Sequence, residues 1–344
     1  MPAASRSRFA VLRRLIPDSF TLALMGAMLA ATFWPANGAT ARILGHVTTV
    51  AIGLLFFLHG AKLSGAVVKA GFTHWRLHLM VLACTFLMFP VLGLMLRPLA
   101  LTLITPELYL GVLYLCTLPS TFQSSIAFTA LARGNVAAAV CSASASNFVG
   151  IFLTPVIVGA LIMHGAGGHS ATSSIVAFAE QLLLPFVAGQ AMRRWIGGWI
   201  DRNKAMLRYV DQGSILLVVY AAFSEAVGEG LWQKLTPEAF FNLGVVTLAL
   251  LLLAMLCTAW ASRRLGFSKE DQIAIVFCGS KKSMASGVPM AKVLFATSTL
   301  GVLIVPLMLF HQIQLMVCAL LAQHYAQRPE EVPATVAPGS DAPV

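Results

Sequence analysis

Charged residues are scarce in this sequence. Of its 344 residues, 10% are Asp, Glu, Lys or Arg and 58% are hydrophobic, whereas a soluble domain carries about 25% charged residues. Because this is too little charge to cover a globule, the sequence predicts a membrane protein surrounded by lipid for most of its length. The net charge of +10 does not indicate a nucleic-acid partner, because no basic patch is interleaved with exposed aromatic residues.

Motifs for catalysis, disulfides and resident metals are also missing. The six cysteines all lie in apolar segments and form no C-x-x-C pair, which predicts buried thiols and neither disulfides nor a zinc site. H-E-x-x-H, P-loop and G-x-S-x-G patterns do not occur, so we expect neither an enzyme nor a resident cofactor. The apolar segment after the basic stretch Met1–Pro17 lacks a small-x-small cleavage site, so we interpret it as a retained first helix.

The sequence does contain a series of apolar segments. A membrane-spanning helix needs about 20 mainly apolar residues, and we count ten candidate segments. They cover approximately residues 20–34, 47–64, 77–96, 108–131, 136–163, 175–192, 214–230, 239–261, 272–295 and 300–322. A Gly/His/Ser loop, Gly165–Ser174, follows the fifth segment. The Pro-, Ala- and acid-rich tail 327–344 is predicted to be disordered.

The distribution of basic residues predicts the orientation. With a cytoplasmic N-terminus, 17 of the 23 Lys and Arg residues fall in cytoplasmic segments. Four fall in outer loops, namely Arg42, Arg97, Lys234 and Lys292. Because cytoplasmic loops carry an excess of Lys and Arg, this asymmetry favours ten spans with both ends inside.

Two of the ten segments are interrupted by helix-breaking and polar residues. The fourth contains Leu118-Pro-Ser-Thr-Phe-Gln-Ser-Ser125, and the ninth contains Phe277-Cys-Gly-Ser-Lys-Lys-Ser283. Repeats of five helices must be inverted relative to each other, so we expect a cytoplasmic tail, 1–19, and two inverted repeats, 20–165 and 166–326. Interrupted helices at matching positions of inverted repeats indicate a transport site.

Polar side chains near the first interruption are candidate ligands. An interrupted helix leaves unpaired carbonyls, which favour cations, and unpaired amides, which favour anions. If the two interrupted helices cross, nearby hydroxyls and amides complete the site. The candidates in the first repeat are Ser120, Thr121, Gln123, Ser124, Ser125 and Asn147. The alternatives are that the serines serve packing and that Pro119 only kinks the helix.

The adjacent residues Lys281 and Lys282 demand an explanation, because a cation at the bilayer centre costs roughly 2.5–3.5 kcal/mol on insertion scales. If the helix is shorter than predicted, they snorkel to an interface instead. Adjacent residues on a helix point about 100° apart, so we expect one of them to face the site. Other polar residues complete the candidate set: Ser280 and Ser283 at the site, and Glu180 and His311 as pathway or interhelical hydrogen-bonding residues.

Four segments together carry a resemblance to a known family. They are Leu118-Pro-Ser-Thr-Phe-Gln-Ser-Ser-Ile-Ala-Phe-Thr-Ala-Leu-Ala-Arg-Gly-Asn135, Ser146-Asn-Phe-Val-Gly-Ile-Phe-Leu-Thr-Pro155, Phe277–Ser283 and His311-Gln-Ile-Gln314. Over about residues 15–325 the sequence resembles the bile acid:sodium symporter family, solute carrier family 10, and within it the bacterial sodium-dependent transporters related to the seventh human member. The resemblance implies an all-α fold of ten helices in inverted repeats. It also implies a core domain of helices 3–5 and 8–10, in which helices 4 and 9 cross, and a panel domain of helices 1, 2, 6 and 7.

The sodium ligands of that family transfer to this sequence only in part. The resemblance puts sodium ligands at Ser124 and Ser125. Its Glu-Cys-Gly-x-Gln-Asn stretch puts Phe277 at the acidic ligand and Lys281 and Lys282 at the glutamine and asparagine. Its remaining ligand positions carry Thr85, Ala139 and Ala143 here. Because hard cations prefer oxygen ligands, we hypothesise that a lysine, in the first instance Lys281, replaces a coupling sodium or binds an anionic substrate group.

Together these features predict a secondary transporter in the cytoplasmic membrane that moves an organic anion by alternating access, and the resemblance implies sodium symport. Two alternatives stay open. One is a sodium-independent or proton-coupled carrier in which a ninth-helix lysine replaces the coupling cation. The other is a membrane regulatory protein that transports nothing. The expected partners are a small organic anion and the lipid bilayer, whereas the substrate's identity, the stoichiometry and the oligomeric state are not specified by the sequence.

Overall fold

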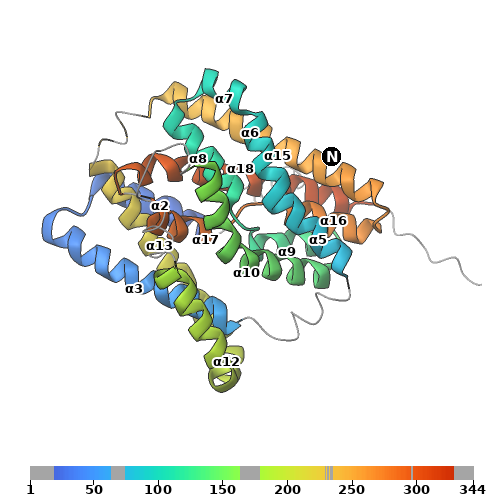
Figure 1. The fold of residues 1–344 in the computed structure, drawn as a ribbon, viewed down its shortest axis with the longest axis horizontal. Coiled ribbons are helices and arrows are strands. Elements are labelled where there is room, and N and C mark those ends of the chain that lie inside the picture. The colour runs from blue at the N-terminus through green and yellow to red at the C-terminus, as the bar shows by residue number, and fades with distance from the viewer. Residues whose placement is uncertain are drawn as a thin grey trace, which may run out of the picture.

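The described part of the chain is entirely helical, with no strand (Figure 1). This computed structural model describes residues 19–62, 74–162, 179–228, 230, 232, 235–295 and 297–328. The loop Gly165–Ser174 and most of the two predicted tails lie outside the described residues.

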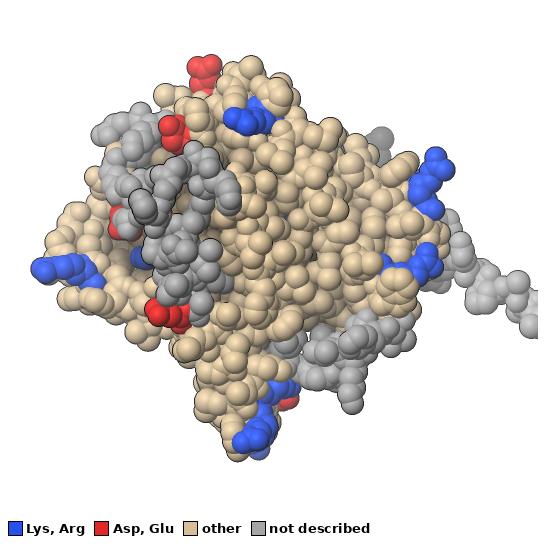
Figure 2. Space-filling view, in the orientation of Figure 1, with Lys and Arg blue, Asp and Glu red and all other residues tan. Residues whose placement is uncertain are grey.

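Six spans are long and apolar enough to cross a membrane, judged by length and composition. They are α3 (Gly38–Lys62), the continuous run of α5 (Trp75–Ala83), η1 (Cys84–Met88) and α6 (Phe89–Met95), α10 (Val136–Leu161), α13 (Lys204–Gly228), α15 (Pro237–Arg264) and α18 (Thr297–Ala326). Their outer faces are apolar, and Val50 and Phe241 are each 71% exposed. Charged side chains lie mainly around the periphery in Figure 2, and a broad uncharged surface lies between them. This multi-pass membrane architecture agrees with the scarcity of charge in the sequence.

The remaining helices are shorter. They are α2 (Ser19–Phe33), α7 (Arg97–Leu103), α8 (Pro106–Thr117), α9 (Phe122–Leu131), η3 (Ala179–Leu183), α12 (Leu184–Arg202), α16 (Lys269–Gly279) and α17 (Met284–Leu294). The two segments predicted to be interrupted are each two helices, α8 with α9 and α16 with α17. The interruptions themselves, 118–121 and 280–283, are shorter than the polar stretches 118–125 and 277–283 from which they were predicted.

Several helices begin where the sequence provides a capping residue. The hydroxyls of Thr105, Thr236 and Ser268 each accept a hydrogen bond from the backbone N–H three residues ahead. Pro106 and Pro237 follow two of these caps at the first helical position, where a missing N–H costs nothing. Helices α3, α13, α15 and α18 are longer than predicted, because hydropathy marks only the apolar part of a helix.

Two sets of helices pack closely and also contact each other. In one, α12 lies against α3 and α13 lies against α2; in the other, α8 lies against α18, α9 against α10, and α16 against both α9 and α15. The sets meet where α13 lies against α17 and α18. The resemblance assigns these sets to the panel and the core, and that division stays a prediction.

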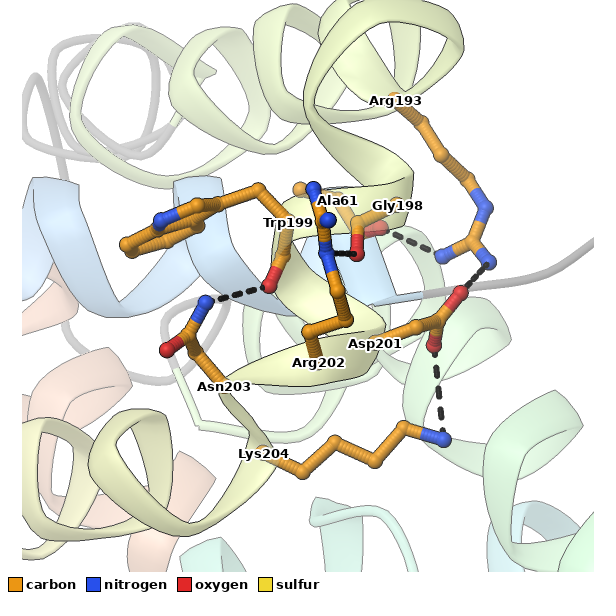
Figure 3. Close-up of polar contacts among 8 residues, drawn as sticks. All are labelled: Ala61, Arg193, Gly198, Trp199, Asp201, Arg202, Asn203 and Lys204. Atoms are coloured by element: carbon orange, nitrogen blue, oxygen red, sulfur yellow. Dashed lines mark hydrogen bonds and ion pairs between the residues drawn. The ribbon is translucent and has the colours of Figure 1, made fainter.

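Basic residues from separate segments gather where α3 and α12 end and α13 begins. Arg193 on α12 donates to the carbonyl oxygen of Ala61 and lies 3.7 Å from Asp201 (Figure 3). Asp201 also lies 3.4 Å from Lys204, and Lys62 forms an ion pair with Asp211. The charge distribution predicts that the end of α3 and the connection between α12 and α13 lie on the same side of the membrane, and their proximity is consistent with that prediction.

Helices α3 and α12 approach so closely that only glycine fits at two points. A Cβ atom on Gly60 would lie 2.0 Å from the carbonyl oxygen of Phe186, and one on Gly189 would lie 2.0 Å from that of Phe57. Both contacts are with backbone, which cannot move away as a flexible side chain can. These glycines therefore fix the distance between the two helices.

Replacing Gly60 by alanine is expected to destabilise the protein by about 1–3 kcal/mol, the usual cost of overpacking. The matched control is Gly45→Ala in the same helix, because a Cβ atom there meets nothing within 4 Å. Thermal unfolding of detergent-solubilised protein measures the difference. We expect a lower Tm for Gly60→Ala and an unchanged or higher Tm for Gly45→Ala, since alanine favours helix by about 1 kcal/mol. Equal Tm values would contradict the close approach.

Candidate functional site: the two interrupted helices

The two helix interruptions are in direct contact. The Ser120 hydroxyl donates to the carbonyl oxygen of Cys278 (2.5 Å), and the Thr121 hydroxyl donates to that of Lys282 (2.8 Å). In the other direction, the Ser283 N–H donates to the carbonyl oxygen of Pro119 at 2.9 Å. Irregular backbone is tolerated at membrane depth only where other protein groups or water satisfy it. Here each interruption provides partners for the other.

The serines of the candidate set have different roles. Ser125 donates to the carbonyl oxygen of Phe277 at 3.0 Å and so joins α9 to the end of α16. Ser280, directly after α16, donates back to the carbonyl oxygen of Val276 in that helix. Ser283 caps α17 by accepting from the Ser286 N–H at 3.2 Å. Ser124 accepts a hydrogen bond from Lys281 at 3.2 Å.

Asn147 on α10 supports both interruptions. Its Nδ2 donates to the carbonyl oxygen of Ser120 at 2.9 Å, and its Oδ1 accepts from the Ser286 hydroxyl at 3.0 Å. The Ser146 hydroxyl, on the residue just before Asn147, accepts from the Ser120 N–H at 3.0 Å. The amide of Asn147 is thus a positioning group that connects residues from the two interrupted helices.

Both lysines are fully buried, at 0% exposure, so neither reaches the surface. The snorkelling alternative is therefore wrong. The side chains diverge, because Lys281 extends toward α9 and Lys282 extends toward α8 and η1. Among the described residues no Asp or Glu side chain is buried. The two amino groups therefore lie among carbonyls, hydroxyls and aromatic rings, with no buried carboxylate as a partner in the described part of the chain.

The Lys282 Nζ donates to three backbone carbonyls. The distances are 2.7 Å to Thr85, 2.8 Å to Cys116 and 2.7 Å to Leu118. An ammonium has three N–H donors and no acceptor, so all three donors are used. The Nζ also lies 4.2 Å from the ring centroid of Phe89, within the range of a cation–π contact.

The Lys281 Nζ has a less polar environment. Its hydrogen bond to the Ser124 hydroxyl is long, at 3.2 Å, and the ring centroids of Phe128 and Phe277 lie 4.5 and 5.7 Å away. An aromatic face attracts a cation but leaves N–H groups available to another acceptor. Of the two lysines, Lys281 therefore has the greater capacity to bind an additional anionic or polar group.

Gln314 on α18 is a site residue that the candidate set missed. Its Oε1 accepts from the Lys282 N–H at 2.9 Å and its Nε2 donates to the Lys282 carbonyl at 3.0 Å, so one amide holds both backbone groups of that residue. His311, a predicted pathway residue, lies one turn earlier with its Nδ1 2.9 Å from Gln314 Nε2. The signal for Gln314 was its place in the His-Gln-Ile-Gln segment of the resemblance.

Three predicted residues occupy other positions. Gln123 is exposed on α9, and Glu180 is exposed in η3, so the structure brings neither into the contact between the interruptions. The Thr85 hydroxyl bonds back to Val81 at 2.8 Å, and only the Thr85 carbonyl contributes to the site.

Comparisons with known proteins place this arrangement in a family. A model of the SBF-like CPA transporter family matches residues 18–327. The chain belongs to the SBF-like CPA transporter family. This result confirms the resemblance that the sequence segments carry.

Relatives of this protein are similar to it over nearly its whole length. An uncharacterised protein of Pseudomonas aeruginosa is 61% identical over 326 residues, which are 94% of this chain and 97% of that protein. The Escherichia coli protein named "Putative symporter YfeH" is 52% identical, covering 93% and 96% of the two chains. Sodium/bile acid cotransporter 7 of Mus musculus is 27% identical, covering 90% and 93%. A membrane transporter is thus the class that these similarities support.

Proposed function

We propose that this protein is a secondary active transporter that moves an organic anion across the cytoplasmic membrane by alternating access. The observation that carries the proposal is the mutual pairing of the interruptions at 118–121 and 280–283, which brings four half-helix ends together. Half-helix ends at a crossing of this kind are the elements from which transporters build substrate and ion sites. The symporter and bile acid cotransporter names of the relatives point to the same class.

The proposed architecture has ten spans in two inverted five-helix repeats with both termini cytoplasmic. Six spans are continuous and apolar. The proposal adds α2, the η3–α12 segment and the two interrupted pairs as the other four. In the transport cycle, a core of α5–η1–α6, α8–α10 and α15–α18 moves against a panel of α2, α3, α12 and α13.

Within the site, Lys281 is proposed to bind the anionic group of the substrate. Its ammonium has one weak hydroxyl acceptor and two aromatic neighbours, and no buried carboxylate of the described chain competes for it. Charge-assisted hydrogen bonds are about twice as strong as neutral ones, so an oxyanion is the natural additional acceptor. The side chain is buried here, so the cycle must expose it before substrate binds.

A sodium-independent or proton-coupled carrier is the second candidate, and the position of the lysines favours it. The resemblance puts sodium ligands at Ser124 and Ser125, but the Lys281 ammonium lies 3.2 Å from Ser124 Oγ and a phenyl ring at Phe277 replaces the carboxylate. A sodium ion there would lie next to a fixed positive charge. In this candidate function, Lys281 takes part of the place of the coupling ion.

Transport by the purified protein in proteoliposomes tests the proposal. Labelled cholate serves as the bile-acid probe beside a panel of small organic anions, with counterflow as the readout. Exchange of any of these anions supports a transporter. An inward Na⁺ gradient that accelerates uptake supports symport, whereas acceleration by a proton gradient alone supports the second candidate. If no anion exchanges, the non-transporting regulatory protein becomes the better interpretation.

A further inference from the structure

We propose that the carbonyl oxygens of Thr85, Cys116 and Leu118 form a monovalent-cation site that the Lys282 ammonium occupies, and that this site accepts a free cation when the ammonium is removed. The site is distinct from the Ser124–Ser125 pair, which contacts Lys281. The inference rests on the proposed function only for its consequence for coupling, because cation binding is measurable without transport.

The first of the three carbonyls is released by a π-helical turn followed by a proline. In η1 the Phe89 N–H bonds to Cys84 five residues earlier, so the next residue in the same pattern would bond to Thr85. That residue is Pro90, which has no N–H. The Thr85 carbonyl oxygen is therefore left without the donor that this pattern would supply, and it accepts from Lys282.

The other two carbonyls lie at the carboxyl end of α8. The helical partner of the Cys116 carbonyl would be the Ser120 N–H, but that N–H donates to the Ser146 hydroxyl. Leu118 adopts an extended conformation with ψ of 154°, which turns its carbonyl out of the helical direction. Because unpaired carbonyls at a helix C-terminus carry partial negative charge, this end of α8 favours a cation.

The lysine backbone is held so that its side chain reaches these carbonyls. Gln314 bonds both the N–H and the carbonyl of Lys282, and Thr121 bonds the same carbonyl. The ammonium lies 2.7–2.8 Å from three acceptor oxygens, one in η1 and two at the end of α8. Unwound carbonyls and half-helix ends are the groups that coordinate free cations in transporters, and here a covalently attached cation has the same ligands.

The consequence for the proposed transporter is that one cation is resident. A tethered ammonium neutralises these carbonyl dipoles, and it cannot be released with the substrate. The protein therefore needs no ion from solution at this position. When the ammonium is removed, the same three carbonyls bind a cation that exchanges with solution.

Thermal unfolding of the detergent-solubilised Lys282→Ala protein tests the site. Na⁺, K⁺ and n-propylammonium are compared at equal ionic strength with choline, whose bulk should keep it out of the space left by the ammonium. We expect at least one of the three ions to raise the Tm of Lys282→Ala by about 3–5 °C at 100 times its Kd. The unsubstituted protein, whose site is filled, and Lys292→Ala, which removes a partly exposed lysine of α17, are expected to show no such difference.

Equal Tm values for Lys282→Ala in all four cations would overturn the proposal, as would an equal shift in the unsubstituted protein. If Lys282→Ala does not fold, Lys282→Asn is measured in the same way, because its shorter side chain keeps a polar group and leaves room for an ion. Failure of both variants to fold in any of the cations would also overturn it, since a site for free cations should be rescued by them. Absence of anion exchange by the unsubstituted protein would sink the transport proposal and leave the binding result standing.

Discussion

Replacing Lys281 by methionine is expected to reduce organic-anion transport by about tenfold to a hundredfold while the protein stays folded. Methionine is apolar and has a similar length, so it fills the space beside the rings of Phe128 and Phe277. Substituting a buried charge by a well-packed apolar side chain is often neutral or stabilising. The ammonium, by contrast, is the group that we propose binds the substrate anion, and a hydrogen bond to a charged group contributes about 1.5–3 kcal/mol.

The measurement is initial uptake of an anion that the unsubstituted protein exchanges, with the Tm measured on the same preparation. Lys292→Met is the matched control, because Lys292 lies in α17 of the same interrupted pair and is partly exposed. We expect Lys292→Met to keep transport within about twofold, less than the roughly tenfold change of 1.4 kcal/mol. Normal uptake by Lys281→Met would exclude Lys281 as the substrate's counter-ion, whereas a large fall in Tm would show a structural role instead.

Much of the helix pattern could be predicted from local sequence. The apolar segments, the Thr-Pro starts of α8 and α15 and the two interruptions all depend on neighbouring residues, and the structure places helices there. The short helix α7 was missed. Its segment, Arg97–Leu103, is too short to register as a span, and several of its apolar side chains are exposed.

The contact between the interruptions was predicted, but the division of roles between the lysines was not. The first hypothesis favoured Lys281 as the built-in cation, whereas the structure gives three carbonyls to Lys282. Which carbonyls lack helical partners depends on the π-helical turn before Pro90 and on Ser146, which takes the Ser120 N–H. The first is an irregular helical turn and the second is a contact between two helical segments, and residue type alone does not encode either.

The Gln314 amide is a further case in which residue type did not reveal the role. A glutamine within an apolar helix is compatible with many interhelical hydrogen bonds. Its specific role follows only from the position of α18, which places the side chain opposite the Lys282 backbone with a donor and an acceptor in matching positions. The position of Lys282 Nζ among its carbonyls therefore depends on a side chain from another helix.

Replacing Gln314 by leucine is consequently expected to lower both stability and transport. Leucine has a similar volume, so no large cavity forms, but the buried Lys282 N–H loses its acceptor. Leaving a buried donor without a partner costs about 1–3 kcal/mol. The Lys282 carbonyl keeps the Thr121 hydroxyl at 2.8 Å, so the damage falls mainly on the N–H and on the direction of the lysine side chain. We expect the Tm to fall by several degrees and uptake to fall by at least about tenfold, the equivalent of 1.4 kcal/mol.

The control for this prediction is Gln312→Leu, which makes the same substitution two residues earlier on the same helix. Gln312 is only partly buried, and Gln314 is fully buried. If the effect came from lost polarity on α18 in general, the two variants would behave alike. If it comes from the Lys282 backbone, as the geometry indicates, only Gln314→Leu loses stability and transport. The Gln314 amide holds both the N–H and the carbonyl of Lys282. A small displacement of α18 should therefore shift the Lys282 ammonium relative to its three carbonyl partners.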